Sequence, residues 1–199
     1  MSFMSAILSE KFITIACDGQ LTRPDGTLQG GFHKYFKLKN TLIDTIYIGG
    51  TGSADALIQL KKYMTQQSVK MDWKTAREYL VLFLNSNHDF FKENHDSTYL
   101  MVGTDRLNKR TRGIAFEVGK SITESKYFGG SEHLSYIFAT PPDVNYEDVK
   151  KTFLELADGV GVADANRLIQ AQREIFKYVA SKSATVNTEF IQKRINTNV

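Results

Sequence analysis

The apolar segment from Phe12 to Cys17 constrains the fold of this chain more than any other part of the sequence. It reads Phe-Ile-Thr-Ile-Ala-Cys, so threonine is its one strongly polar residue. A strand with one solvent-exposed face alternates apolar and polar residues, whereas a strand covered on both faces is apolar throughout. The segment from Tyr99 to Val102 has the same character. The sequence therefore predicts strands that are buried on both sides.

The order of the expected elements extends this prediction to the whole chain. Strands come first, two helices follow, strands return, helices follow again, and a strand closes the chain. We expect strands at 3–8, 12–17, 41–48, 98–103, 111–118, 122–128 and 184–190, and helices at 53–66, 72–92, 145–157 and 164–180, with a short helix after Gly130. Two stacked sheets with helices on both outer faces satisfy this order. The expected fold class is α+β, a four-layer αββα sandwich formed by a single domain over residues 1–199.

The first two strands predict where Ser2 lies. They are separated by the polar stretch Ser9-Glu10-Lys11, which indicates a hairpin. With a turn near Glu10, the numbers of paired residues add to about 19 to 21, so Ser2 falls opposite residues 17 to 19. We therefore expect Ser2 to face Asp18.

The next connection brings a basic residue to the same place. The segment Arg23-Pro24-Asp25-Gly26-Thr27 carries a Pro-Asp-Gly turn signal. A return strand centred on this turn has pair numbers that add to about 51 to 53, which places Lys34 beside the residues that Ser2 faces. A hydroxyl, a carboxylate and an amine are therefore expected to converge at Ser2, Asp18 and Lys34.

The chemistry of this group depends on the removal of Met1, which normally occurs before a residue as small as serine. The Ser2 α-amine would then lie next to its own hydroxyl. An unperturbed α-amine has a pKa of about 8, so at neutral pH it can accept the hydroxyl proton. A Lys34 ammonium nearby would hold this amine neutral, and the Asp18 carboxylate would keep the lysine charged and oriented.

With these residues in place, the chain resembles the proteasome β-subunit family of N-terminal nucleophile (Ntn) hydrolases. It is most similar to the bacterial proteasome-like peptidase that works with a separate unfoldase ring. The resemblance places the family's nucleophile on Ser2, its Gly-Asp-Gly-Gln stretch on Cys17-Asp18-Gly19-Gln20, and its catalytic lysine on Lys34. It also implies the four-layer fold.

The resemblance continues downstream. The stretch from Tyr47 to Ala56 looks like the family's strand, glycine-rich turn and helix start, where a backbone N–H stabilises an oxyanion. Gly49 or Gly50 would supply this N–H, and the sequence leaves the choice open. The stretch from Tyr127 to Ser131 resembles the family's Gly-Ser-Gly turn before a helix. The segment Ser181-Lys182-Ser183 stands where the family has an Asp-x-x-Ser element, and it contains no carboxylate.

The resemblance implies a hydrolase that cleaves peptide or amide bonds through a Ser2 acyl-enzyme once Met1 is removed. The alternative is a catalytically inactive member of the same fold that serves as an assembly or binding protein. The expected partners are a peptide or amide substrate, further copies of the chain in a ring, and an unfoldase.

Composition excludes several other classes. A net charge of +3 requires neither a nucleic acid nor a membrane as partner, and the sequence shows no targeting or membrane segment, so a cytoplasmic protein is expected. The single Cys17 ends an apolar strand and is expected to be an inert core residue. No cofactor is expected, because the Gly49–Gly52 turn lacks the Gly-Lys-Ser/Thr ending of a phosphate loop. No metal site is expected from the four scattered histidines, which are His33, His88, His95 and His133.

The two helices in the middle of the chain predict assembly. Successive helical residues are 100° apart, so Tyr79, Phe83, Phe90 and Phe91 cannot all point inward. An apolar strip is therefore expected on the isolated chain, and a homo-oligomer would bury it.

Overall fold

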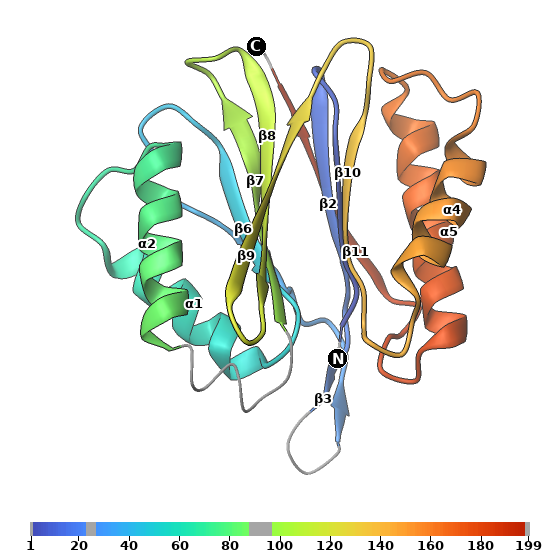
Figure 1. Cartoon of the computed structure of the whole chain (residues 1–199), viewed down its shortest axis with the longest axis horizontal. Helices are drawn as coiled ribbons and strands as arrows, with labels where there is room; N and C mark the ends of the chain where they lie inside the picture. The colour runs from blue at the N-terminus through green and yellow to red at the C-terminus, as the bar shows by residue number, and fades with distance from the viewer. Residues whose placement is uncertain (1, 23–26, 88–96, 198–199) are drawn as a thin grey trace.

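The structure is a computed structural model, and it describes residues 2–22, 27–87 and 97–197. Two antiparallel sheets lie face to face, with helices α1 and α2 on the outer side of one sheet and α4 and α5 on the outer side of the other (Figure 1). The predicted αββα sandwich is confirmed. No helix among the described residues combines the length and apolarity needed to cross a membrane.

The first sheet joins strands from both ends of the chain, whereas the second sheet follows the order of the chain. The first sheet has the order β10 (Ser135–Ala139), β1 (Met4–Leu8), β2 (Phe12–Asp18) and β11 (Phe190–Asn196). The second has the order β5 (Tyr35–Lys37), β6 (Ile46–Gly50), β7 (Ser97–Asp105), β8 (Arg110–Val118) and β9 (Ile122–Gly129). A small separate hairpin consists of β3 (Leu21–Thr22) and β4 (Leu28–Gln29).

The four helices of the described residues begin at polar caps. Each cap side chain accepts a hydrogen bond from a backbone N–H of the first turn, which otherwise has no partner within the helix. The sequence predicted Ser53 as the first of these caps, and this is confirmed. The helices and their caps are α1 (Ala54–Gln66) with Ser53, α2 (Trp73–Ser86) with Asp72, α4 (Tyr146–Ala157) with Asn145, and α5 (Ala165–Lys182) with Asp164.

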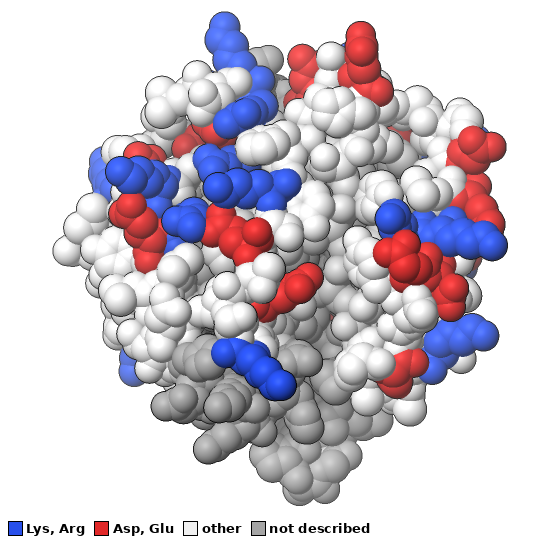
Figure 2. All heavy atoms as spheres, in the orientation of Figure 1, with Lys and Arg blue, Asp and Glu red and all other residues white. Residues whose placement is uncertain are grey.

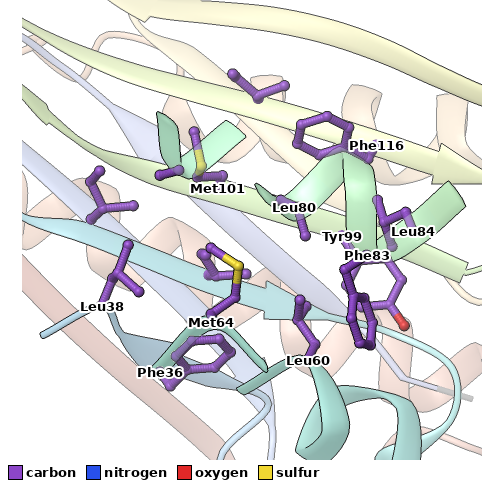
Figure 3. Packing of buried hydrophobic residues seen from close by; sticks show 14 of the residues in the cluster. Phe36, Leu38, Leu60, Met64, Leu80, Phe83, Leu84, Tyr99, Met101 and Phe116 are labelled. Carbon is purple, nitrogen blue, oxygen red and sulfur yellow. The ribbon is translucent and has the colours of Figure 1, made fainter. Parts of the chain in front are cut away.

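Three apolar layers hold the sandwich together. The middle layer lies between the sheets and contains Met4, Ile15 and Cys17 from the first sheet and Leu100 from the second. An outer layer joins α4 and α5 to the first sheet. The other outer layer joins α1 and α2 to the second sheet, and Figure 3 shows its side chains interdigitating. Strand β2 contributes to two of these layers, which explains why both of its faces carry apolar residues.

Three of the predicted elements are wrong. The short helix after Gly130 is absent, and strand β10 occupies that part of the chain. The strand expected at 41–48 begins at Ile46. The closing strand begins at Phe190 rather than at residue 184, because side-chain oxygens of Ser183 and Asn187 accept backbone N–H bonds and form turns instead.

The predicted apolar strip on α2 differs in part from the structure. Phe83 is buried in the outer layer and Tyr79 is partly buried against it, while Phe90 and Phe91 lie outside the described residues. The large apolar side chains that are exposed on these helices are Ile58 of α1 and Leu82 of α2. Exposed apolar surface on α1 and α2 is therefore present, but other residues supply it.

Candidate active site

Pairing between β1 and β2 positions Ser2. Met4 pairs with Cys17, so the pair numbers add to 21, and the same register places Phe3 opposite Asp18 and Ser2 beside Gly19. The Phe3 N–H donates to Asp18 Oδ1 over 2.8 Å, and the Asp18 N–H donates to the Phe3 carbonyl over 3.2 Å. Ser2 is 6% exposed. The expectation that Ser2 faces Asp18 is therefore wrong by one residue, because Phe3, which follows Ser2, is the residue fixed to the Asp18 carboxylate.

Lys34 reaches the same carboxylate from the other hairpin. The β3–β4 pairing, Leu21 with Gln29, differs by one from the expected pair sum, but beyond it the Phe32 N–H donates to the Gly19 carbonyl over 3.0 Å. This contact brings Lys34 Nζ to 2.6 Å from Asp18 Oδ2. The two side chains are 4% and 0% exposed. The expected contact between Asp18 and Lys34 is therefore present, as a buried ion pair.

Burial changes the proton affinity of Lys34. Desolvation lowers its pKa below the usual value, and the charge and hydrogen bond of Asp18 oppose this change without cancelling it. The ammonium is consequently held by one close carboxylate in surroundings that favour loss of its proton. A lysine of this kind can influence the protonation of a neighbouring amine.

Cys17 is placed as the sequence predicted. It is fully buried between the sheets, and desolvation raises the pKa of its thiol to about 12. A thiol with so high a pKa carries almost no thiolate at neutral pH. Cys17 is therefore a core residue.

The two predicted oxyanion donors lie at the end of β6, near Lys34. The Gly50 N–H donates to the Lys34 carbonyl over 3.0 Å. Alternate N–H groups of an antiparallel strand point to opposite neighbours, so the Gly49 N–H points toward β7, where Gly49 pairs with Leu100. A side chain at Gly49 would also collide with Met4 and with the Lys34 carbonyl. Gly49 thus allows close approach of β1 and β5, while Gly50 makes room for Tyr99 of β7 and uses its N–H within the sheet.

The expected Gly-Ser-Gly counterpart is at the wrong end of the sandwich. Gly130 lies between β9 and β10, where its carbonyl accepts the Glu10 N–H over 3.2 Å. Glu10 belongs to the turn between β1 and β2, at the opposite end of these strands from Ser2. Ser131 follows Gly130 and is excluded from the site for the same reason.

The far end of β10 places other polar residues near Ser2. Met4 pairs with Ala139, and continuing this register puts Pro141 beside Ser2. Two residues later, Asp143 Oδ1 accepts a hydrogen bond from Ser183 Oγ over 3.0 Å, and Ser183 Oγ lies 2.8 Å from Thr185 Oγ1. Ser183 therefore contacts a carboxylate that comes from another segment of the chain. Sequence spacing could not reveal this, because Asp143 and Ser183 are 40 residues apart.

Sequence reasoning also missed Glu189. Its carbonyl accepts the Gly19 N–H over 3.1 Å, and its Oε2 accepts the Gly31 N–H over 2.9 Å. The carboxylate occupies the space where a side chain at Gly19 would lie. Glu189 is exposed, and its charge acts on both Lys34 and Cys17.

A cavity of about 440 Å³ opens at this end of the molecule. Its wall includes Thr98, whose carbonyl accepts the Thr51 N–H just after the glycine pair, and Thr140, which follows β10. The lining mixes hydroxyl, charged and aromatic side chains. The cavity therefore lies near the strand ends that carry the site, and Ser2, Asp18 and Lys34 do not line it.

Among the described residues, metal-binding side chains form no second candidate site. Acidic and basic side chains are interspersed over the face that Figure 2 shows. Among the described residues, no group of three or more His, Cys, Asp and Glu side chains could hold a metal ion. His33 packs edge-on against Tyr35, while His88 and His95 lie outside the described residues.

No family model and no curated protein matches this sequence. Solved structures do match the fold. Anbu, described as an ancestral beta-subunit, from Yersinia bercovieri has a TM-score of 0.70 at 9% identity, over 98% of this chain and 82% of that one. HslV from Trypanosoma brucei has a TM-score of 0.60 at 10% identity, over 98% and 99%. BPH from Thiobacillus denitrificans, in complex with epoxomicin, has a TM-score of 0.63 at 13% identity, over 98% of each chain.

This chain has the proteasome-like Ntn hydrolase fold. Within this fold, Ser2 directly precedes Phe3, whose N–H binds the Asp18 carboxylate that also contacts Lys34. An amine, a hydroxyl and a lysine can exchange protons in such an arrangement. Met1, whose removal would create the amine, lies outside the described residues.

Proposed function

We propose that this protein is a peptide- or amide-bond hydrolase of the proteasome type, with Ser2 as its nucleophile after removal of Met1. One observation carries the proposal. The Asp18 carboxylate is buried, binds the Phe3 N–H through one oxygen and Lys34 Nζ through the other, and so fixes the start of β1 against a lysine. A chain that needed only a stable sheet edge would gain little from burying this pair.

The proposed reaction uses the Ser2 α-amine twice. The amine accepts the hydroxyl proton while Ser2 Oγ attacks the substrate carbonyl carbon, and it then returns this proton to the leaving amine when the C–N bond breaks. An ester on Oγ remains. The same amine accepts a proton from water, whose oxygen attacks the ester, and the hydroxyl is restored when the C–O bond breaks. Lys34 keeps the amine neutral between these steps.

The oxyanion donor remains the predicted Gly49 or Gly50. For Gly50 to act, its N–H has to exchange the Lys34 carbonyl for the substrate oxyanion. A shift of the segment between β4 and β5 would allow this exchange. The proposal therefore includes a small rearrangement on substrate binding.

Covalent labelling tests the nucleophile directly. We expect a peptide epoxyketone to modify the N-terminal residue of protein whose Met1 has been removed, and intact mass and peptide mapping would locate the adduct at Ser2. Protein with Ser2→Ala serves as the matched control. Equal labelling of wild type and Ser2→Ala protein would contradict the assignment of Ser2.

One observation favours a second candidate function. Because Gly50 already uses its N–H inside the sheet, the fold is also compatible with a catalytically inactive homologue that acts as an assembly or binding protein. A free α-amine on Ser2 distinguishes the two functions. N-terminal mass analysis of the protein from its own host would show Ser2 for the hydrolase and a retained Met1 for the inactive homologue.

The hydrolase proposal extends to a cytoplasmic ring of identical subunits that works with an unfoldase. Exposed Ile58 and Leu82 support assembly, because burying them would remove apolar surface from water. Light scattering coupled to size exclusion should show a multimer at micromolar concentration. A stable monomer of 22.5 kDa would remove the ring and leave the Ser2 chemistry to be tested separately.

A further inference from the structure

Glu189 lies at the same level of the first sheet as Ser2. Phe190 pairs with Asp18 in the β11–β2 ladder, so Glu189 lies beside Gly19. The β1–β2 ladder places Ser2 on the other side of Gly19. Neighbouring strands are about 4.8 Å apart, so two spacings separate the backbones of Ser2 and Glu189 by about 10 Å.

The two residues also share a face of the sheet. Residues two apart along a strand point the same way, and Met4, Cys17 and Ile191 all contact the layer between the sheets. Ser2, Gly19 and Glu189 are each two residues from one of these. They therefore face the second sheet, and Gly19 puts no side chain between the other two.

The Glu189 carboxylate is held in place. Oε2 accepts the Gly31 N–H over 2.9 Å, and the Glu189 carbonyl accepts the Gly19 N–H. The side chain remains exposed, so the carboxylate is fixed in orientation and still open to a ligand. An oriented, accessible carboxylate next to a nucleophile is a recognition element for a cation.

A basic side chain is long enough to reach the Glu189 carboxylate, which lies over Gly19, one strand spacing of about 4.8 Å from Ser2. Lysine and arginine extend about 6 Å from their Cα atoms to the charged group. A substrate residue whose carbonyl lies at Ser2 Oγ can therefore place its ammonium or guanidinium against Glu189. With a shorter or apolar side chain, the Glu189 carboxylate stays hydrated and gains no contact with the substrate.

We propose that Glu189 is a specificity-determining residue that selects peptides with lysine or arginine next to the scissile bond. This inference rests on the proposed hydrolase function. It assigns the substrate class through one charge on Glu189, which directly precedes β11 and is absent from the predicted Ser2, Asp18 and Lys34 group.

Matched peptide substrates test the inference. Fluorogenic peptides that are identical except for arginine, norleucine or glutamate before the scissile bond would be compared, together with quenched peptides that carry the same three residues after it. We expect kcat/KM to be about fivefold to tenfold higher for arginine than for norleucine at one of these positions, and lowest for glutamate.

Two variants of Glu189 assign the preference. Glu189→Gln keeps an oxygen for the Gly31 N–H and removes the charge, so the arginine peptide should lose its advantage over the norleucine peptide. Glu189→Lys should favour the glutamate peptide. Glu174→Gln is the matched control, because Glu174 is an α5 residue that pairs with Lys177 on the surface.

The outcomes separate this inference from the function on which it depends. Turnover of every peptide with equal efficiency, or an arginine preference that Glu189→Gln leaves intact, overturns the role of Glu189 and keeps the hydrolase. An equal loss for arginine and norleucine in Glu189→Gln overturns it as well, and indicates that Glu189 only supports the Gly31 backbone. Absence of turnover together with absence of epoxyketone labelling overturns the hydrolase itself.

Discussion

Two carboxylates of this protein are paired with basic side chains in opposite surroundings. Asp18 and Lys34 are 0% and 4% exposed, and the pair lies at the end of the first sheet beside Ser2. Glu124 and Arg77 join β9 to α2 on the outer side of the second sheet and are 17% and 37% exposed. Water screens the outer pair but not the inner one.

The two ion pairs differ in how much they contribute to the stability of the fold. Burying two charges costs several kcal/mol per ion before their attraction is counted, so an inner pair seldom stabilises more than apolar side chains would. A partly exposed pair is inexpensive to form and contributes about 0 to 1 kcal/mol. The proposed hydrolase chemistry at Ser2 would account for the inner pair, while the outer pair is an ordinary link between a strand and a helix.

The largest effect is expected from Asp18→Asn. The variant leaves the Lys34 charge buried without its carboxylate, and loss of one partner of a buried pair costs about 3 to 5 kcal/mol. The low end applies, because burial already lowers the pKa of Lys34 and the lysine can lose its proton. Urea unfolding followed by circular dichroism would measure the change.

A double variant sharpens this prediction. Asp18→Asn with Lys34→Met removes both charges, and much of the lost stability should return while labelling of Ser2 stays low. If stability and labelling return together, the pair has only a structural role.

Lys34→Ala should act mainly on catalysis. Asp18 keeps hydrogen bonds from the Phe3 and Gln20 N–H groups, so the remaining carboxylate is better satisfied than an unpaired Lys34 would be. Turnover should fall at least about a hundredfold, the scale of losing a positioned acid–base partner. Lys37→Ala, at an exposed position on β5, is the matched control. Insoluble Lys34→Ala protein would instead mark the pair as structural.

The pH dependence should report the same lysine. The pKa of Lys34 is lowered from 10.5, so the folded protein binds fewer protons than the unfolded chain just below pH 10.5. The resulting penalty on stability is present at low pH and disappears as pH rises through that window. Stability relative to Lys34→Met should therefore increase toward pH 10.5, while turnover declines below it as the ammonium is lost. If wild-type turnover begins to decline only at or above pH 10.5, the decline does not report the titration of Lys34.

Much of the fold could be predicted from the sequence because its signals are local. The apolar run of β2, the caps of the helices and the alternation of β8 are all visible within short windows. The β9–β10 connection was mistaken for the start of a helix because glycine and serine occur in both. The pairing of β10 with β1 determines the structure of this segment, and no local sequence pattern indicates this pairing.

The candidate site also has one part that could be predicted from the sequence and one part that could not. The contact between Asp18 and Lys34 could be predicted from turn geometry, because both hairpins are short. Asp143 with Ser183, and Glu189 with Gly31, are contacts across 40 and 158 residues, and their side chains have no motif of their own. Topology creates these contacts, so they emerge only when the sheets are assembled.

The smallest effect is expected from the outer pair. A hydrogen bond and the charge of Arg77 lower the pKa of Glu124, so its contribution is present above pH 4.5 and is lost as pH falls. Because water screens this pair, Glu124→Gln should reduce stability by less than about 1 kcal/mol at neutral pH and leave Ser2 labelling unchanged. Urea unfolding beside Asp18→Asn would measure both variants under one condition. If Glu124→Gln costs as much as Asp18→Asn, burial is not what separates the two pairs, and the catalytic explanation of the inner one loses its physical basis.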